Sequence, residues 1–552
     1  MEYVSGSQTN GMPMPPGVTA ITDIKYPKRA NKTLSKAVSL HLEGKLEGAA
    51  RLLSKAIEDG EQDPGLYAAL GHIQYEMHDY EAAADTYATL SEMEPKHRTA
   101  SFNLGVCRGN LRQWSDAAAA FRRAFEADAT RSESLLGLGI TLIHDGQPAE
   151  ALEPLDKYLS LYPNHEQALF GHAVALQQTG KHAAAVEQYR KVLARNPRCE
   201  EALSNLVAMF LEKKDHESVR RYADMLSEIQ PESPMATEAL AALAFQDGDY
   251  ATAAKLCRAL AETSPDRFEH WFNLGVACHK MGSYEKAAQA YQQAAGLDPG
   301  SAQAHLNLGV AQQELNDLAG ARVSYERALN IDPAQSGALW NLALVLEQQG
   351  ERQWAEKLYA RINEDTPEWC DASFRLGYLR LLRGDYADSA AAFEACVLQR
   401  PDWPEAHLNA GIAYARTGDG ERARASFQEA LMLRPDSSDA VRGLAALALE
   451  HEDFDDAYQQ HRRLIELGEH SPELFYNAGL ICQKRGQTED AVTFYQQALG
   501  EDPQFAEALL NLGHALMSLG QEDDARSFWR RAIREKPELA QTYFEPPAAP
   551  VA

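Results

Sequence analysis

The chain repeats one 34-residue pattern along almost its whole length. Three segments align at that period without a gap: EHWFNLGVACHKMGSYEKAAQAYQQAAGLDP, QAHLNLGVAQQELNDLAGARVSYERALNIDP and EAHLNAGIAYARTGDGERARASFQEALMLRP. The same register extends over residues 30–539 and accommodates fifteen units. A unit of this length is too small to bury its own apolar face, so neighbouring units must stack on one another. The period therefore predicts one linear array of repeats rather than a set of separate globular domains.

Each unit is predicted to form two helices joined by a turn. With positions counted from the start of each unit (residues 30, 64, 98 and onward), position 8 is Gly or Ala in fourteen units, position 20 is Ala in thirteen and position 32 is Pro in twelve. Small residues allow two helices to approach closely, and the proline ends the second helix. Gly248 and Asp249, at positions 15 and 16, are typical of the turn between the helices. Val207 and Val219 break the small-residue pattern, so we expect that unit to hold its helices less closely.

This pattern resembles the tetratricopeptide repeat family, and the resemblance covers more than nine-tenths of the chain. It implies an all-α fold, a right-handed superhelical α-solenoid of fifteen helix-turn-helix repeats whose first helices line a concave groove. The ends of such an array need polar caps, and Lys36 stands where other units carry Leu. Residues 1–29, rich in Pro and Gly, are expected to form a flexible N-terminal arm. Residues 540–552 are expected to form a C-terminal tail that can make a short capping turn.

Composition excludes several classes of function. Lys and Arg number 53 against 80 for Asp and Glu, a net charge of −27 that argues against nucleic acid as a partner. No apolar run is long enough for membrane insertion. Seven cysteines without a C-x-x-C pair predict no disulfide framework and favour a reducing, cytoplasmic compartment. We expect no catalytic residues, cofactor or metal site, because nucleotide-binding and metalloprotease motifs are absent and only the arm and tail lie outside the repeats. The acidic segment 451–456 is interpreted as a solvated turn.

The groove is expected to present positions 2, 5, 6, 9 and 13, which lie opposite the core positions 4, 7, 8 and 11 on a helical wheel. Position 6 is Asn in eight units. A primary amide donates and accepts at once, so a row of amides can bond the main chain of an extended peptide. This resembles the asparagine ladder in the repeat arm of O-GlcNAc transferases; the alternative is that Asn is simply common at this position in the family. The candidate amides are Asn103, Asn205, Asn273, Asn307, Asn341, Asn409, Asn477 and Asn511.

Positions 5 and 9 carry apolar and aromatic residues, which would let the groove bury apolar side chains of a partner. The alternative is that these side chains pack against the first helix of the next repeat. The candidates are Phe102, Phe170, Phe272, Trp340 and Phe374 at position 5 and Tyr378 at position 9.

Three arginines are candidates for binding an anionic group of a ligand: Arg375, Arg416 and Arg442, at positions 6, 13 and 5. The alternative is that each is solvated or paired with a neighbouring acid. Acidic residues at position 2, such as Glu133 and Glu201, disfavour the carboxylate clamp with which some repeat proteins hold chaperone C-termini.

The sequence therefore favours a non-catalytic scaffold that binds a protein or an extended peptide in its concave groove and so assembles a complex. Self-association is expected if the arm docks on a neighbouring molecule, since the arm carries an apolar stretch followed by basic residues; the alternative is that the arm is free. The alternative function is a regulatory or substrate-recruiting subunit of an enzyme, such as a glycosyltransferase, carried on another chain.

Overall fold

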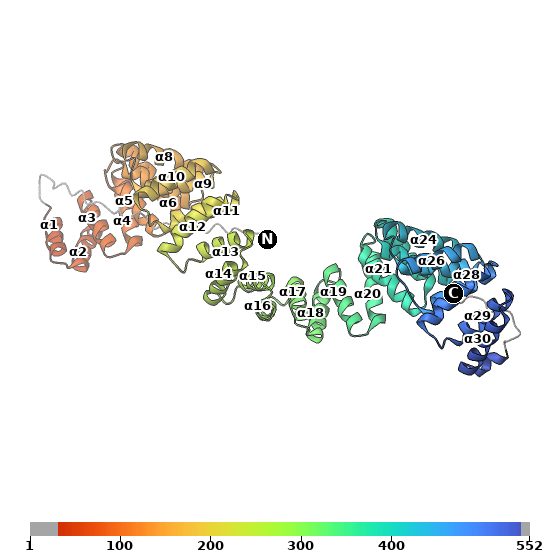
Figure 1. The fold of residues 1–552 in the computed structure, drawn as a ribbon. Helices are drawn as coiled ribbons and strands as arrows, with labels where there is room; N and C mark the ends of the chain where they lie inside the picture. The colour runs from red at the N-terminus through yellow and green to blue at the C-terminus, as the bar shows by residue number, and fades with distance from the viewer. Residues whose placement is uncertain (1–30, 542–552) are drawn as a thin grey trace. The chain divides into compact units, whose positions relative to one another are not determined.

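The computed structural model describes residues 31–541, which form thirty α-helices and one 3-10 helix and contain no strand. The predicted all-α repeat fold is thus confirmed, while the count of fifteen repeats stays a prediction. The arm and almost all of the tail lie outside the described residues. The helices fall into two compact units, which divide between Asp266 and Arg267 (Figure 1).

The helices follow one another as repeated pairs in each unit. The first unit contains α1 (Lys32–Leu42), α2 (Leu46–Glu58), α3 (Pro64–Glu76), α4 (Tyr80–Met93), α5 (Ala100–Asn110), α6 (Trp114–Ala127), α7 (Glu133–His144), α8 (Pro148–Leu161), α9 (Glu166–Gln178), α10 (His182–Arg195), α11 (Glu200–Glu212), α12 (His216–Ile229), α13 (Pro234–Gln246) and α14 (Tyr250–Thr263). The second contains α15 (Phe268–Lys280), α16 (Tyr284–Leu297), α17 (Ala302–Glu314), α18 (Leu318–Ile331), α19 (Ser336–Gln348), α20 (Arg352–Asp365), α21 (Cys370–Arg383), α22 (Tyr386–Gln399), α23 (Pro404–Thr417), α24 (Gly420–Leu433), α25 (Ser438–Glu450), α26 (Phe454–Glu466), α27 (Pro472–Lys484), α28 (Thr488–Glu501), α29 (Ala506–Ser518), α30 (Glu522–Glu535) and the 3-10 helix Pro537–Ala540.

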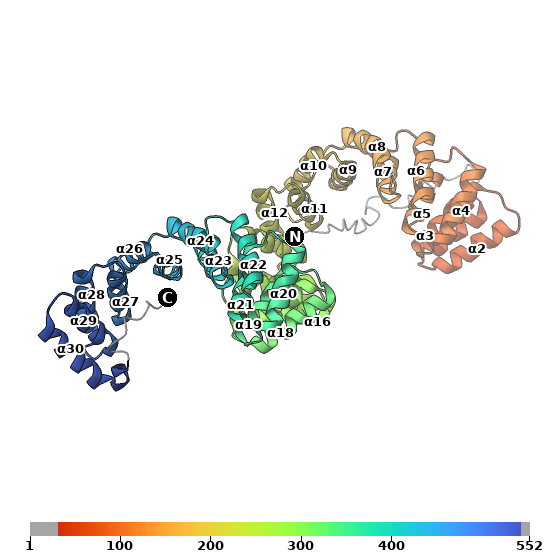
Figure 2. The same ribbon diagram turned by 90° about the vertical axis from the view of Figure 1, so that its right-hand side faces the viewer.

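The core of a repeat is built on the contact between position 8 of the first helix and position 24 of the second. In α17 and α18, which lie side by side in Figure 1 as α29 and α30 do in Figure 2, Gly309 faces the ring of Tyr325, and a Cβ on the glycine would lie 2.5 Å from that ring. Tyr325 is fully buried. The same pairing joins Gly275 to Tyr291 and Gly479 to Tyr495. Position 8 is small because an aromatic ring occupies the space that a side chain would fill.

The repeat formed by α11 and α12 has Val207 instead of a small residue at position 8, yet its core stays closed. Val207 and Val219 are both fully buried, and position 24 of that repeat is the small Ala223, which belongs to the same apolar cluster. The neighbouring Tyr222 stacks on Phe210 instead, with 5.7 Å between ring centroids. A larger residue at position 8 is therefore matched by a smaller one at position 24.

The turn between the two helices requires a left-handed residue at position 15. Gly248 has φ 73°, and the carboxylate of Asp249 then caps α14 by accepting from the backbone N–H of Thr252. The predicted role of this Gly-Asp pair is confirmed. Five repeats carry a non-glycine residue with positive φ at the same position: His78, Arg112, Lys214, Asn316 and Glu452.

The ends of the helices follow the sequence signals. Helix α18 ends at Ile331, two residues before Pro333, as expected of a proline that stops the second helix. Lys36 on α1 is exposed, which suits a solvent-facing cap. Among the described residues, every helix is too short or too polar to cross a membrane.

Candidate functional site

The asparagines at position 6 differ in what their amides contact, and one group is bound within the fold. The Asn205 amide donates to the hydroxyl of Tyr189 over 3.0 Å, and that hydroxyl donates in turn to Gln177 over 2.7 Å. The Asn307 carbonyl accepts from the side chain of Gln303 over 3.0 Å. These amides are therefore partly or fully used inside the chain, so they are less able to bond a ligand.

Two further asparagines are buried and therefore inaccessible to a ligand. Asn103 is 1% exposed and interacts with the hydroxyl of Tyr87. Asn511 is 4% exposed and donates to the hydroxyl of Tyr476 over 2.9 Å. This differs from the expectation that both face an open groove, because both side chains are buried and the Asn511 amide already donates to a phenol. Asn477 is half-buried on α27.

Three asparagines are half-exposed and have no hydrogen-bond partner among the described residues: Asn273 on α15, Asn341 on α19 and Asn409 on α23. The preceding repeat explains two of them. Before Asn409, position 24 is Phe393, which has no hydroxyl. Before Asn341, the hydroxyl of Tyr325 donates to Gln313 over 2.9 Å instead. We call Asn273, Asn341 and Asn409 the open amides.

The phenols that hold the other amides stay neutral. Burial raises the pKa of Tyr189 and of Tyr291 well above the ordinary value, although hydrogen bonds from Asn205 and Asn307 act in the opposite sense. Sequence reasoning missed these partners. A partial signal was present, since Tyr189 at position 24 precedes its partner Asn205 by sixteen residues. The spacing alone is not sufficient, because Tyr325 and Asn341 share it and the Tyr325 hydroxyl donates to Gln313 instead.

The aromatic residues at position 5 pack between two other rings. Trp340 meets Tyr359 edge to face at 5.4 Å and stacks on Trp369 at 5.2 Å. Phe374 has the same arrangement, with Trp403 stacked at 4.4 Å. These contacts support the alternative that position 5 is part of the packing between neighbouring repeats. Both side chains still remain half-exposed.

Phe170 and Phe272 are also half-exposed, with Tyr189 and Tyr291 at 5.8 and 5.7 Å. Phe102 is different because it is fully buried, edge-on to Phe121 at 5.5 Å. The structure therefore removes Phe102 from the surface that the sequence predicted. Tyr378, by contrast, is 39% exposed on α21.

The three candidate arginines differ in whether acidic residues of the fold pair with them. Arg442 is neutralised by Glu469 at 2.7 Å and Asp439 at 2.8 Å, which differs from the expectation that it serves a ligand. Arg375 is exposed, and its nearest acid, Glu347, lies 3.9 Å away. Arg416 is exposed and has no ion pair within the part of the chain that the structure describes.

The acidic turn at 451–456 is occupied by local contacts. Asp453 caps α26, and Asp456 pairs with Arg424 over 2.7 Å. Asp455 lies 2.7 Å from Arg485. Each of these carboxylates thus has a partner from the fold.

Family models described as tetratricopeptide repeat match most of the chain. One model matches residues 108–166, 170–234, 217–268, 238–302, 280–336, 374–440 and 408–472, and a second matches residues 40–102 and 483–542. No curated protein matches the chain.

Several solved structures are similar to it. YrrB, described as a TPR protein with an unusual peptide-binding site, is 23% identical, covers 34% of this chain with 98% of its own, and has a TM-score of 0.32. The C-terminal part of a TPR protein from Cytophaga hutchinsonii is 18% identical, with coverage of 44% and 99% and a TM-score of 0.37. The complex of Naa15 and Naa10 with HypK is 14% identical, with coverage of 93% and 96% and a TM-score of 0.34. At such TM-scores these likenesses carry no inference about function.

Proposed function

Since this chain belongs to the tetratricopeptide repeat family, whose models match well over half of its residues, we propose that it is an interaction scaffold. It binds an extended peptide segment of a partner protein on the first helices of the second unit, α15 to α23. The open amides bond the peptide main chain, and the half-exposed residues at positions 5 and 9 contact its side chains.

The open amides are the observation that carries this proposal. Each of Asn273, Asn341 and Asn409 presents a donor and an acceptor that the described fold leaves without a partner. An amide that is half-buried and unbonded gains more from a ligand than one already satisfied. The three occupy the same repeat position on every second first helix, which suits a ligand that is itself extended.

The surroundings of the open amides supply apolar contact area. Phe272, Trp340 and Leu408 precede the three amides directly and are all half-exposed. Phe272 stacks on Phe268 and Trp340 on Trp369, while Leu408 packs against a buried apolar cluster. A rigid apolar surface beside a hydrogen-bonding group costs little conformational entropy on binding.

The partner class proposed is a protein or an extended peptide, and no role is proposed for nucleic acid. A non-catalytic role is supported by the repeats, which occupy the described residues from α1 to α30. A reducing, cytoplasmic setting is part of the proposal, because the seven cysteines of the sequence include no C-x-x-C pair.

Peptide display on the full-length chain, followed by affinity measurement on the selected peptide, tests the proposal. Replacing Asn273, Asn341 and Asn409 together by Ala should weaken peptide binding by about 1.5–4.5 kcal/mol, which is at least about a tenfold increase in Kd. Methylating the main-chain N–H groups of the peptide should weaken binding to the wild type, because the amides contact the backbone.

A matched control uses asparagines that are already bonded inside the fold. The double variant Asn205→Ala and Asn511→Ala, whose amides lie on α11 and α29 outside the proposed surface, should leave Kd unchanged while lowering the local stability of those two helices. Equal affinity of a folded triple variant and the wild type would contradict the proposed contact. Capture of one catalytic chain as the dominant partner would instead favour the role of an enzyme subunit.

A further inference from the structure

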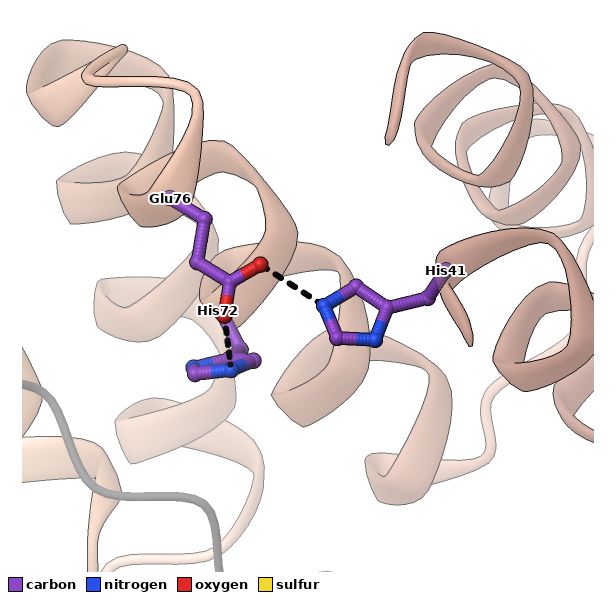
Figure 3. Close-up of side chains that lie close together, drawn as sticks. All are labelled: His41, His72 and Glu76. Carbon is purple, nitrogen blue, oxygen red and sulfur yellow. Dashed lines mark hydrogen bonds and ion pairs between the residues drawn. The ribbon is translucent and has the colours of Figure 1, made fainter. Parts of the chain in front are cut away.

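Two histidines and one glutamate converge at the start of the first unit. His41 lies in the last turn of α1, and His72 and Glu76 lie one turn apart on α3 (Figure 3). Nε2 of His41 is 2.7 Å from one carboxylate oxygen of Glu76, and Nε2 of His72 is 3.0 Å from the other. One ligand atom from each residue lies within 4.8 Å of the other two.

The arrangement comes from two elements that are fixed independently. His72 and Glu76 share a face of α3 because residues four apart on a helix are neighbours. His41 is brought to them from 35 residues before Glu76, by the packing of α1 and α3 on α2. The two rings lie 5.9 Å apart at an angle of 53°, so both nitrogens point at the carboxylate rather than at each other.

We propose that His41, His72 and Glu76 form a site for a zinc ion. Two imidazole nitrogens and one carboxylate oxygen are a ligand set that zinc takes in proteins, with water in the fourth position. Calcium and magnesium prefer oxygen ligands throughout, so the two imidazoles disfavour them. The ion would lie between the three ligand atoms and replace the two hydrogen bonds that now join them.

The site is open enough to be filled from solvent and too open to bind very tightly. The side chains of His41, His72 and Glu76 are 29%, 17% and 37% exposed. Nδ1 of His72 is buried and has no partner in the described chain. A zinc-bound histidine normally donates that proton to an acceptor, whose loss lowers affinity about 10–100-fold. We therefore expect micromolar rather than structural-site affinity.

This site was not predicted from the sequence, where no metal ligands were expected. The three residues lie in two repeats and have no recognisable metal-binding spacing. They hold positions 12, 9 and 13 of their units, and positions 9 and 13 are among those expected to face the groove. The fourth ligand position is thus available to water or to a side chain of a bound protein.

Zinc binding to the full-length chain, measured by competition with a chromogenic chelator at pH 7.5, tests the inference. The expected result is one zinc ion per chain. Cobalt placed in the same site should give the strong visible absorption of four-coordinate Co²⁺. His41→Asn and Glu76→Gln should each weaken binding at least about tenfold.

Glu76→Gln is the sharper variant, because its amide oxygen still accepts from one imidazole while its NH2 group donates to the other ring in that ring's second tautomer, so the helix contact stays in place. His216→Asn is the matched control. It removes an exposed histidine of α12, in another repeat of the first compact unit, and should bind zinc as the wild type does. The inference is overturned if the wild type binds no zinc under these conditions. It is also overturned if Glu76→Gln and His41→Asn both bind zinc with unchanged affinity and an unchanged cobalt spectrum.

Discussion

Replacing Gly309 by Ala should destabilise its repeat, although alanine is the better helix former. The new Cβ would lie 2.5 Å from Cε1 and 2.7 Å from Cδ1 of Tyr325, whereas ordinary contacts begin near 3.4 Å. Tyr325 is fully buried, so its ring has no free space into which to move. Forcing an extra carbon into such a core costs about 1–3 kcal/mol. The gain in helix propensity is about 1 kcal/mol, which leaves a net loss of about 1 kcal/mol and at most about 2.

Gly171→Ala is the matched control. Gly171 also lies in the middle of a first helix, α9, and is buried. A Cβ there would meet Ile143 at 3.7 Å and Leu155 at 3.8 Å, which are ordinary contacts. The propensity gain is then unopposed, and we expect stabilisation by about 1 kcal/mol. The same substitution thus changes stability in opposite directions at two sites, and the ring of Tyr325 is the cause.

Hydrogen exchange measured by mass spectrometry is the suitable assay, because a repeat array opens locally and has no single unfolding free energy. Where exchange follows the opening equilibrium, about 1.4 kcal/mol corresponds to a factor of ten. Residues 302–331 should exchange about fivefold faster in Gly309→Ala, and residues 166–195 about fivefold more slowly in Gly171→Ala. Equal stabilisation in both variants would show that the Tyr325 ring can move aside at little cost. The explanation that ring packing keeps position 8 small would then be wrong.

Three further outcomes are expected. Lys214→Gly should stabilise its repeat by about 1 kcal/mol in the same assay, because φ is 55° there, while Gly248→Ala should destabilise by a similar amount. Burial lowers the pKa of His461, so this side chain is neutral in the folded chain, whereas in the unfolded chain it is protonated below about pH 6.5. The stability of residues 438–471 should therefore be full above that pH and fall below it. His461→Phe should remove this dependence of stability on pH. In native-state alkylation, the half-buried Cys370 should react first and the half-buried Cys199, whose pKa burial raises to about 11, should follow it. Both should react before the buried thiols whose pKa burial raises to about 12, which are Cys107, Cys396 and Cys482.

The fold was predictable because its determinants are local and repeated. The spacing of small residues, the proline at position 32 and the turn at Gly248 each act within one repeat, and the many copies of the pattern make the register unambiguous. What the sequence did not show is how positions pair. Val207 stands out as a defect when position 8 is considered alone, but it is matched by Ala223 at position 24. Such matching is a property of two side chains and the space between them, so it is visible only when the helices are placed together.

The same distinction applies to the candidate site. Eight asparagines at one repeat position appear equivalent in the sequence, yet the fold engages some and leaves Asn273, Asn341 and Asn409 open. The difference depends on whether the preceding repeat offers a hydroxyl and on where that hydroxyl points. Phe393 offers none, and Tyr325 donates elsewhere. Binding capacity in this array is therefore set by the residue at position 24 as much as by the asparagine itself. Phe393→Tyr supplies a phenol at that position, which should bond Asn409 and lower peptide affinity through the loss of that one amide contact. Unchanged peptide affinity in a variant that forms the phenol–amide bond would contradict this account.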